Sequence, residues 1–287
     1  MNGYIWLKFN VVKILLNIFL FCFIITSCGD GTEDIEVFYS NGKLKAKGRM
    51  NEGQEHGSWV RYYEDGSKES SGEFYLGSQT GDWTWWYKNG KLREKSRFDY
   101  GEATGVSKRY FNNGRIRVEE KWRNDLRFGF AKAYHKNGSV NYIGKYLDGI
   151  KDSTWVLYYN SGQVEDSVRY IWGREEGIGV KYFKNGSRRE FGQWKDGAKY
   201  GIWRYFHRNG KEHLKGEFSQ FGWRDGKWMK SDSSGVNDSV VIYTFGFIDT
   251  AYEVLKDTFN LDSIKVNQLD FKNYKKEIEE DGSFSKI

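Results

Sequence analysis

The chain has 287 residues, a formal net charge of +6 and 38% hydrophobic residues, so it is long enough for one large domain or two ordinary ones. It contains no proline, 34 glycines and many aromatic residues, namely 20 Phe, 20 Tyr and 12 Trp. Disordered chains are poor in aromatic residues and collagens need proline, so both classes are excluded. The two cysteines are too few for a disulfide scaffold or a cysteine zinc finger.

The N-terminal residues have the pattern of a secretion signal. Lys8 and Lys13 precede an apolar run over residues 14–25, which ends in Ile25-Thr26-Ser27-Cys28. The alternative is a membrane anchor, but the run is shorter than the ~20 residues that a spanning helix needs. The last four residues resemble the lipobox of bacterial lipoproteins. The resemblance implies removal of residues 1–27, acylation of Cys28 and anchoring to the cell envelope, at the outer membrane, with residues 28–36 as an acidic tether.

Turn dipeptides recur every 24 residues through the middle of the chain. Asn-Gly between alternating segments favours a two-residue hairpin turn of type I′. A second pair of glycines, such as Gly77 and Gly81, marks the other end of most units. We therefore predict an all-β repeat protein, an elongated antiparallel meander of about eight hairpin units over residues 37–230. The turn dipeptides are Asn41-Gly42, Asp65-Gly66, Asn89-Gly90, Asn113-Gly114, Asn137-Gly138, Ser161-Gly162, Asn185-Gly186 and Asn209-Gly210.

Alternation along the strands predicts two different faces of the sheet. Two-residue turns would pair Tyr63 with Lys68, Arg61 with Ser70, and Trp59 with Gly72. One face then carries most of the large aromatic side chains, and we expect it to be packed, with tryptophan rings lying over bare glycine backbone. Its tryptophans are Trp59, Trp83, Trp155 and Trp203, with Gly72 and Gly216 expected opposite the first and the last of them.

The opposite face is mostly charged and carries one aromatic stripe. Rings beside arginines would suit an extended anionic partner through stacking and charge, and the alternative is that they only cover the sheet. We also predict an exposed ion pair between Lys108 and Glu119. The candidate binding stripe consists of Tyr62, Trp86, Tyr110, Tyr134, Tyr158 and Tyr182, with Arg93, Arg117 and Arg189 as expected cross-strand neighbours of Trp86, Tyr110 and Tyr182.

These units resemble the variant MORN repeats of bacterial proteins. The pattern is an aromatic pair, a turn, a variable strand, a glycine, an aromatic residue, and a glycine-bounded loop before Trp. It is most complete from Tyr62 through Gly72, Phe74 and Gly81 to Trp83. The resemblance covers residues 37–230 and implies an extended antiparallel sheet that holds partners. It also implies an antitoxin or immunity-type role as one alternative, because bacterial examples are often labelled antitoxin components.

Residues 231–287 are predicted to form a small α/β cap on the last repeat. The apolar residues 240–248 are expected to pair with the edge of the repeat sheet. Thr250 and Glu253 have capping-box spacing, so a helix is predicted to begin there, with a second one near residues 267–280. The alternative is a small partner-docking domain. The segment is acidic, whereas the repeat region is basic.

The sequence contains no pattern typical of catalysis or of metal binding. The four histidines lack metal-ligand spacing, and His135 and His207 replace Tyr or Phe at one repeat position. We therefore expect no enzyme activity, no cofactor and no metal. The predicted function is a non-catalytic, membrane-anchored scaffold for an unknown protein partner. A glycan- or anionic-polymer-binding surface lipoprotein is the alternative, and nucleic acid is not an expected partner of an exported protein.

Overall fold

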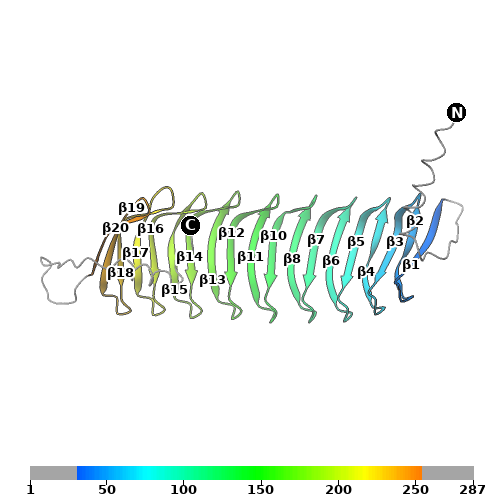
Figure 1. Ribbon diagram of the computed structural model, residues 1–287, viewed down its shortest axis with the longest axis horizontal. Coiled ribbons are helices and arrows are strands. Elements are labelled where there is room, and N and C mark those ends of the chain that lie inside the picture. Colours follow the sequence, from blue (N-terminus) through cyan, green and yellow to red (C-terminus); the bar gives the residue numbers. More distant parts are fainter. Residues whose placement is uncertain (1–30, 254–287) are drawn as a thin grey trace, which may run out of the picture. The chain divides into compact units, whose positions relative to one another are not determined.

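The computed structural model describes residues 31–253, which form twenty β-strands and no helix. They belong to two compact units. The first unit comprises the described residues up to Ser139 together with Tyr146–Gly149, and the second comprises Val140–Lys145 and the described residues from Ile150. Within each unit, successive strands pair antiparallel with their neighbours, except that β10 pairs with β8 rather than with the two-residue β9 (Figure 1). The prediction of an all-β hairpin meander is confirmed.

The strands have similar lengths in both units. The first unit contains β1 (Thr32–Phe38), β2 (Leu44–Asn51), β3 (Gln54–Tyr62), β4 (Lys68–Tyr75), β5 (Ser78–Trp86), β6 (Leu92–Asp99), β7 (Glu102–Tyr110), β8 (Ile116–Arg123), β9 (Leu126–Arg127) and β10 (Gly129–Tyr134). Strand β11 (Val140–Leu147) contributes residues to both units. The second unit contains β12 (Ile150–Tyr158), β13 (Val164–Ile171), β14 (Arg174–Tyr182), β15 (Arg188–Lys195), β16 (Ala198–Phe206), β17 (Glu212–Phe218), β18 (Arg224–Ser231), β19 (Asn237–Thr244) and β20 (Phe247–Glu253).

The Asn-Gly and Asp-Gly turns are three-residue loops, so the prediction of two-residue type I′ turns at these sites is wrong. In the turn after β3, the Gly66 N–H donates to the Tyr63 carbonyl and the Tyr63 N–H donates to the Ser67 carbonyl. Only Gly66 has a positive φ, of 92°, and Asp65 does not. The Asp65 carboxylate accepts the Ser67 N–H instead, at 2.8 Å. An Asx side chain used in this way favours a type I turn closed by a left-handed glycine.

The two-residue turns lie at the other end of the strands. Leu76 and Gly77 connect β4 to β5 and have φ values of 46° and 80°, as a type I′ turn requires. The same conformation recurs at most of the equivalent turns, for example at Trp172-Gly173 and Phe245-Gly246, but Gly222 closes a three-residue loop instead. This conformation is unfavourable for bulky residues such as leucine and tryptophan. The turns are therefore determined by the hairpin register and the glycine, rather than by an Asn or Asp side chain.

The packed face is built from tryptophans that lie over glycines of the preceding strand. We call the side of the sheet that carries Trp59, Trp83, Trp155, Trp203 and Trp228 the tryptophan face. Gly72 is paired with Trp59 as predicted. However, the ring that covers it is that of Trp83, because a Cβ atom added at Gly72 would lie 2.2 Å from Trp83 Cδ2. The glycines covered in this way are Gly48, Gly72, Gly144, Gly192 and Gly216.

A break in strand pairing makes room for each of these rings. The β4–β5 register shifts between Ser71 and Glu73, next to Gly81 on β5, which has a positive φ of 63°. Trp83 Nε1 donates to the Glu73 carbonyl at 3.0 Å, and the side chain is only 1% exposed. The bulge thus frees a carbonyl that the indole N–H satisfies, so a large ring is buried without an unpaired donor.

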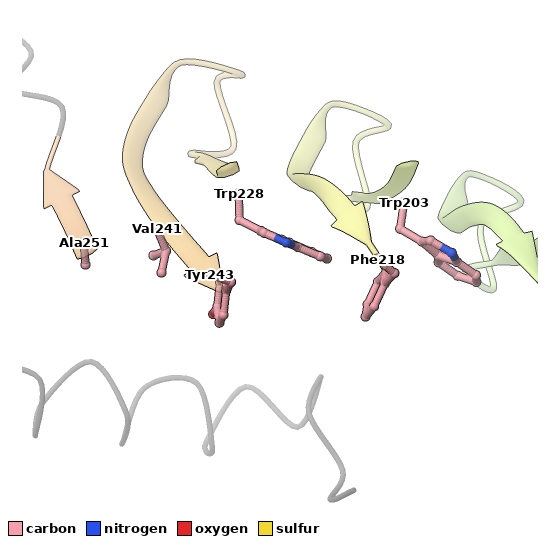
Figure 2. Close-up of a cluster of buried hydrophobic side chains, with 6 residues drawn as sticks. All are labelled: Trp203, Phe218, Trp228, Val241, Tyr243 and Ala251. Carbon is pink, nitrogen blue, oxygen red and sulfur yellow. The ribbon is translucent and has the colours of Figure 1, made fainter. Parts of the chain in front are cut away.

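Aromatic rings then stack edge to face along the tryptophan face. In the first unit Phe74 lies 6.2 Å from Trp59 and 4.9 Å from Trp83, measured between ring centroids. In the second unit Phe218 lies in the same way between Trp203 and Trp228, at 6.2 and 5.1 Å. Figure 2 shows these side chains projecting to one side of their strands together with those of Val241, Tyr243 and Ala251. The predicted packed face is confirmed.

Both ends of the described chain differ from the sequence-based expectation. Residues 32–36, predicted to be part of an acidic tether, belong to β1 and pair with β2. Residues 240–248 do not form one strand, because the turn at Phe245-Gly246 divides them between β19 and β20. The helix predicted to begin at Thr250 is wrong, since β20 continues to Glu253 in register with β19. Cross-strand hydrogen bonding here outweighs the local capping signal. Cys28, the signal residues and the predicted second helix lie outside the described residues.

Candidate functional site

The residues of the predicted stripe stand at equivalent places, as the last residues of their strands. Tyr62, Trp86 and Tyr110 end β3, β5 and β7, and all three side chains are half-buried. Their expected cross-strand partners are wrong by one residue, because the three-residue loops introduce a register shift: Trp86 pairs with Leu92 instead of Arg93, and Tyr110 pairs with Ile116. In the same way Tyr134, Tyr158 and Tyr182 end β10, β12 and β14, and Tyr182 pairs with Arg188 instead of Arg189.

Several members of the stripe have partners within the protein. Lys68 Nζ lies 5.2 Å from the centre of the Trp86 ring. The Tyr134 hydroxyl donates to Glu119 at 3.0 Å, and Glu119 forms the predicted ion pair with Lys108 at 2.8 Å. The hydrogen bond from Lys108 is the main cause that lowers the pKa of the Glu119 carboxyl group. These contacts hold the Trp86 and Tyr134 rings against neighbouring side chains of the sheet.

The three arginines assigned to the stripe have different environments. Arg93 Nη1 donates to the Tyr63 hydroxyl over a long distance of 3.4 Å, and that hydroxyl donates to the Trp86 carbonyl. Arg117 is exposed on β8. Arg189 Nε lies 3.5 Å from Glu190 Oε1. Among the interactions described for these three side chains, only that of Arg93 reaches a residue next to the stripe.

Large apolar side chains are most exposed at the two-residue turns and beside them, a feature that the sequence analysis did not identify. In the first unit Tyr75 and Tyr100 contact each other edge to face at 5.8 Å. In the second unit Trp172 is 72% exposed and Phe247 is 78% exposed. The other exposed apolar residues at or beside these turns are Leu76, Leu126, Ile150, Ile171 and Phe245, whereas the exposed Phe221 and Trp223 lie in and directly after a three-residue loop between β17 and β18. The sequence signal for these exposed side chains is a large apolar residue directly before the glycine of a two-residue turn, as in Leu76-Gly77 and Trp172-Gly173.

The tryptophan face of the second unit also holds cations against aromatic rings at a repeated position. Lys151 Nζ lies 4.6 Å from the ring of Trp155, and Lys199 Nζ lies 4.1 Å from the ring of Trp203. Arg224 lies in the same way over Trp228, with its guanidinium carbon 4.3 Å from the ring centre. In each case the ring belongs to the residue four positions later. Cation–π attraction stabilises such contacts.

One repeat of the second unit departs from this arrangement and contains a cavity. The cation and the tryptophan are replaced by Glu175 and Gly179, and a cavity of about 90 Å³ lies at this place. Its lining combines carboxylates, one ammonium group, aromatic rings and aliphatic residues. The lining residues are Asp166, Val168, Tyr170, Glu175, Gly179, Val180, Lys181, Glu190, Trp194 and Trp203.

Burial perturbs the ionisable groups in and beside this cavity. Desolvation raises the pKa of the Asp166 carboxyl group and of the Tyr170 hydroxyl. Desolvation also lowers the pKa of the Lys199 ammonium group, although Glu190 lies 3.4 Å away and opposes that effect. Groups whose charged forms are poorly solvated in this way are typical of binding sites, and they also occur in structural ion pairs.

The described residues contain no group of three or more His, Cys, Asp or Glu side chains that could hold a metal ion. His207 and His213 approach each other, with 3.2 Å between His213 Nδ1 and His207 Nε2. His207 Nε2 also lies 2.9 Å from the Ser231 carbonyl, in the way that the Tyr63 hydroxyl bonds to the Trp86 carbonyl. His207 thus takes the structural place of a tyrosine, as its repeat position predicted. Over residues 31–253 we find no helix with the length and hydrophobicity needed to cross a bilayer.

The sequence profile of the MORN repeat variant family matches residues 79–100, which cover β5 from its second residue, the turn after it and β6. Repeats of this kind are generally associated with protein or membrane-lipid binding. No curated protein matches the chain. The matched segment contains Gly81, Trp83 and Asn89-Gly90, which are the residues that form the bulge, the buried ring and the three-residue turn.

Proposed function

We propose that this chain is a non-catalytic repeat scaffold that binds a protein partner at the bacterial cell envelope, to which lipidated Cys28 anchors it. The observation that carries the proposal is the exposure of aromatic side chains at the two-residue turns of the second unit. Trp172 and Phe247 expose about three quarters of their surface. Exposed aromatic residues of this kind are enriched in the energetically dominant part of protein interfaces.

The packing of the three-residue loop between β17 and β18 against one of these turns supports a preformed surface. The Phe221 and Trp223 rings contact each other at 5.7 Å. A Cβ atom at Gly246 would lie 3.4 Å from Trp223 Cβ, so the turns on either side of β18 and β19 are in contact. A surface held in place before binding loses little conformational entropy when the partner docks.

The proposal is tested by affinity purification from the detergent-solubilised membrane fraction, quantified by mass spectrometry. The wild type is compared with a Trp172→Ser/Phe247→Ser variant and with Ile202→Ser, a matched control that removes an exposed apolar side chain away from the turns. We expect the wild type and the control to enrich the same protein, and the turn variant to lose it. Equal enrichment by all three proteins, or no protein enriched by the wild type, would contradict the proposal.

A further inference from the structure

The cavity at Gly179 lies in the one repeat of the second unit where the cation-and-tryptophan pair is lost. The equivalent position of the three other pairs is occupied by Lys151, Lys199 and Arg224, each beside its own tryptophan ring. Here Glu175 stands where the cation would be and Gly179 where the tryptophan would be. The glycine at position 179 leaves space where the tryptophan ring would lie, and the glutamate at position 175 reverses the charge.

The aromatic surroundings of the position are otherwise retained. Trp194, on the next strand, partly enters the space, because a Cβ atom at Gly179 would lie 2.4 Å from its Nε1 atom. The Trp194 and Trp203 rings meet edge to face at 5.1 Å. The Nε1 atoms of Trp59, Trp83, Trp155, Trp203 and Trp228 each donate to a backbone carbonyl. No such bond is made by Trp194 Nε1 within the part of the chain that the structure describes.

Carboxylates outnumber cations in the lining, and in the described part of the chain the nearby Lys199 and Arg189 form ion pairs only with Glu190 among these carboxylates. Asp166, Glu175 and Glu190 contribute carboxylates, whereas Lys181 is the only cation among the residues that line this cavity. Lys181 stands opposite both Asp166 and Glu190 in the strand register. Lys199 Nζ lies 3.4 Å from Glu190 Oε2, donates to the Tyr205 hydroxyl at 2.9 Å and lies against Trp203. Glu175 receives one hydrogen bond, from the Tyr170 hydroxyl at 3.0 Å, which leaves its second oxygen able to accept another.

From this geometry we propose that the cavity binds an external alkylammonium group, which takes the place that Lys151 and Lys199 occupy in the neighbouring repeats. Glu175 is the counter-ion and the indole of Trp194 is the aromatic wall. The cavity is small, so it admits the end of an amine chain and not a folded ligand. Two sources share this chemistry, the lysine side chain of a protein and a free polyamine. The site does not depend on the scaffold function proposed above.

The proposal is tested by titrating the purified full chain, in a non-ionic detergent, with n-butylammonium chloride at constant ionic strength. The indole N–H resonance of Trp194, assigned through a Trp194→Phe variant, reports binding by NMR. We expect a saturable shift of this resonance, and at least about tenfold weaker binding by Glu175→Lys, which supplies an internal cation. The matched control is Glu217→Lys, which makes the same charge change at an exposed position of β17 and is expected to bind as the wild type does.

Folding of the variants is checked by the unchanged indole resonances of Trp155 and Trp228. If Glu175→Lys alters them, Glu175→Gln is used with the same expectation, because it removes the charge and retains the size. No saturable shift with n-butylammonium, equal binding of uncharged n-butanol, or equal affinity of the Glu175 variant and the wild type would overturn the proposal. Titrations with spermidine and with the peptide Gly-Lys-Gly then distinguish the two sources. Tighter binding of spermidine indicates a free polyamine, and tighter binding of the peptide indicates a lysine side chain of a protein.

Discussion

The side chains at two positions on adjacent strands of the tryptophan face have complementary sizes in each repeat. Gly72 leaves room for Trp83, as Gly192 does for Trp203. One repeat after Gly72 and Trp83, Ser96 and Ser107 occupy the same two positions, and their buried hydroxyls share a hydrogen bond of 2.7 Å. In the next repeat the pair is Glu120 and Ala131, and the buried Glu120 carboxylate binds Arg109 at 2.7 Å. When the first position (that of Gly72) carries a side chain, the second position (that of Trp83) therefore carries a small residue.

We expect the two positions to be strongly coupled in stability. Gly72→Ser should cost about 1–3 kcal/mol, because the new side chain would overlap the Trp83 ring. Trp83→Ser should cost about 3–5 kcal/mol, since it empties a buried site. The double variant reproduces the Ser96–Ser107 pair and should cost less than the sum of the single changes. A double-mutant cycle from urea denaturation measures the difference.

The matched control for this cycle is Gly42→Ser. Unlike Gly72, Gly42 has a left-handed backbone, with φ of 81°, and nothing lies within 4 Å of the position that a Cβ atom would take. Its cost should be about 1–2 kcal/mol from the backbone alone and should add to that of Trp83→Ser. If the Gly72–Trp83 cycle were as additive as this control, size matching would not be the reason for the pairing.

At the scale of the element, each hairpin depends on its neighbours for burial. Trp59, on β3, lies over Gly48 of β2 and contacts Phe74 of β4. Trp59→Ala should therefore accelerate hydrogen exchange most in β2, β3 and β4, and progressively less in β6 to β8, because repeat units couple mainly to adjacent units. Mass-spectrometric hydrogen exchange measures this profile, with the exposed-site variant Val106→Ala as the control. An equal acceleration over the whole first unit would show a single cooperative unit instead.

Substitution of the aromatic stripe tests whether its rings stabilise the sheet or bind a partner. Tyr134 bonds to Glu119, and Trp86 lies beside Lys68. Replacement of Trp86, Tyr110 and Tyr134 together by Ser is therefore expected to lower the urea midpoint and to leave retention on heparin–agarose unchanged. The matched control is Tyr75→Ser/Tyr100→Ser, which removes exposed rings and should leave the midpoint almost unaltered. Loss of retention with an unchanged midpoint would assign anionic-polymer binding to the stripe.

At the scale of the whole molecule, we expect membrane attachment to depend on Cys28, which lies outside the described residues. If Cys28 is acylated, metabolic labelling with a fatty-acid analogue should mark the wild type and Cys22→Ala, and should not mark Cys28→Ala. Two or more acyl chains hold a protein firmly on a membrane, so the Cys28 variant should also leave the membrane fraction. An unlabelled wild type that still floats with membranes would instead indicate an uncleaved N-terminal helix.

Four features were predictable from the sequence: the strand count per repeat, the packed tryptophan face, the Trp59–Gly72 register and the Lys108–Glu119 ion pair. These follow from period-two alternation and from glycine spacing, which are local properties of the chain. The tertiary structure alone decided the three-residue loops, because an Asx side chain competes with the type I′ geometry that Asn-Gly also allows. This change moved the cross-strand partners of the stripe by one residue.

The tertiary structure also decided which ring covers Gly72, that β20 extends through Thr250, and where a cavity remains. Each of these depends on side-chain packing between neighbouring strands or on hydrogen bonds between β19 and β20. The 24-residue spacing shows that glycine replaces tryptophan at position 179 and that glutamate replaces a cation at position 175. Only the structure shows that Trp194 fills the space incompletely and that three carboxylates line what is left. Packing of side chains from several strands is a non-local property, and periodicity along one chain does not specify it.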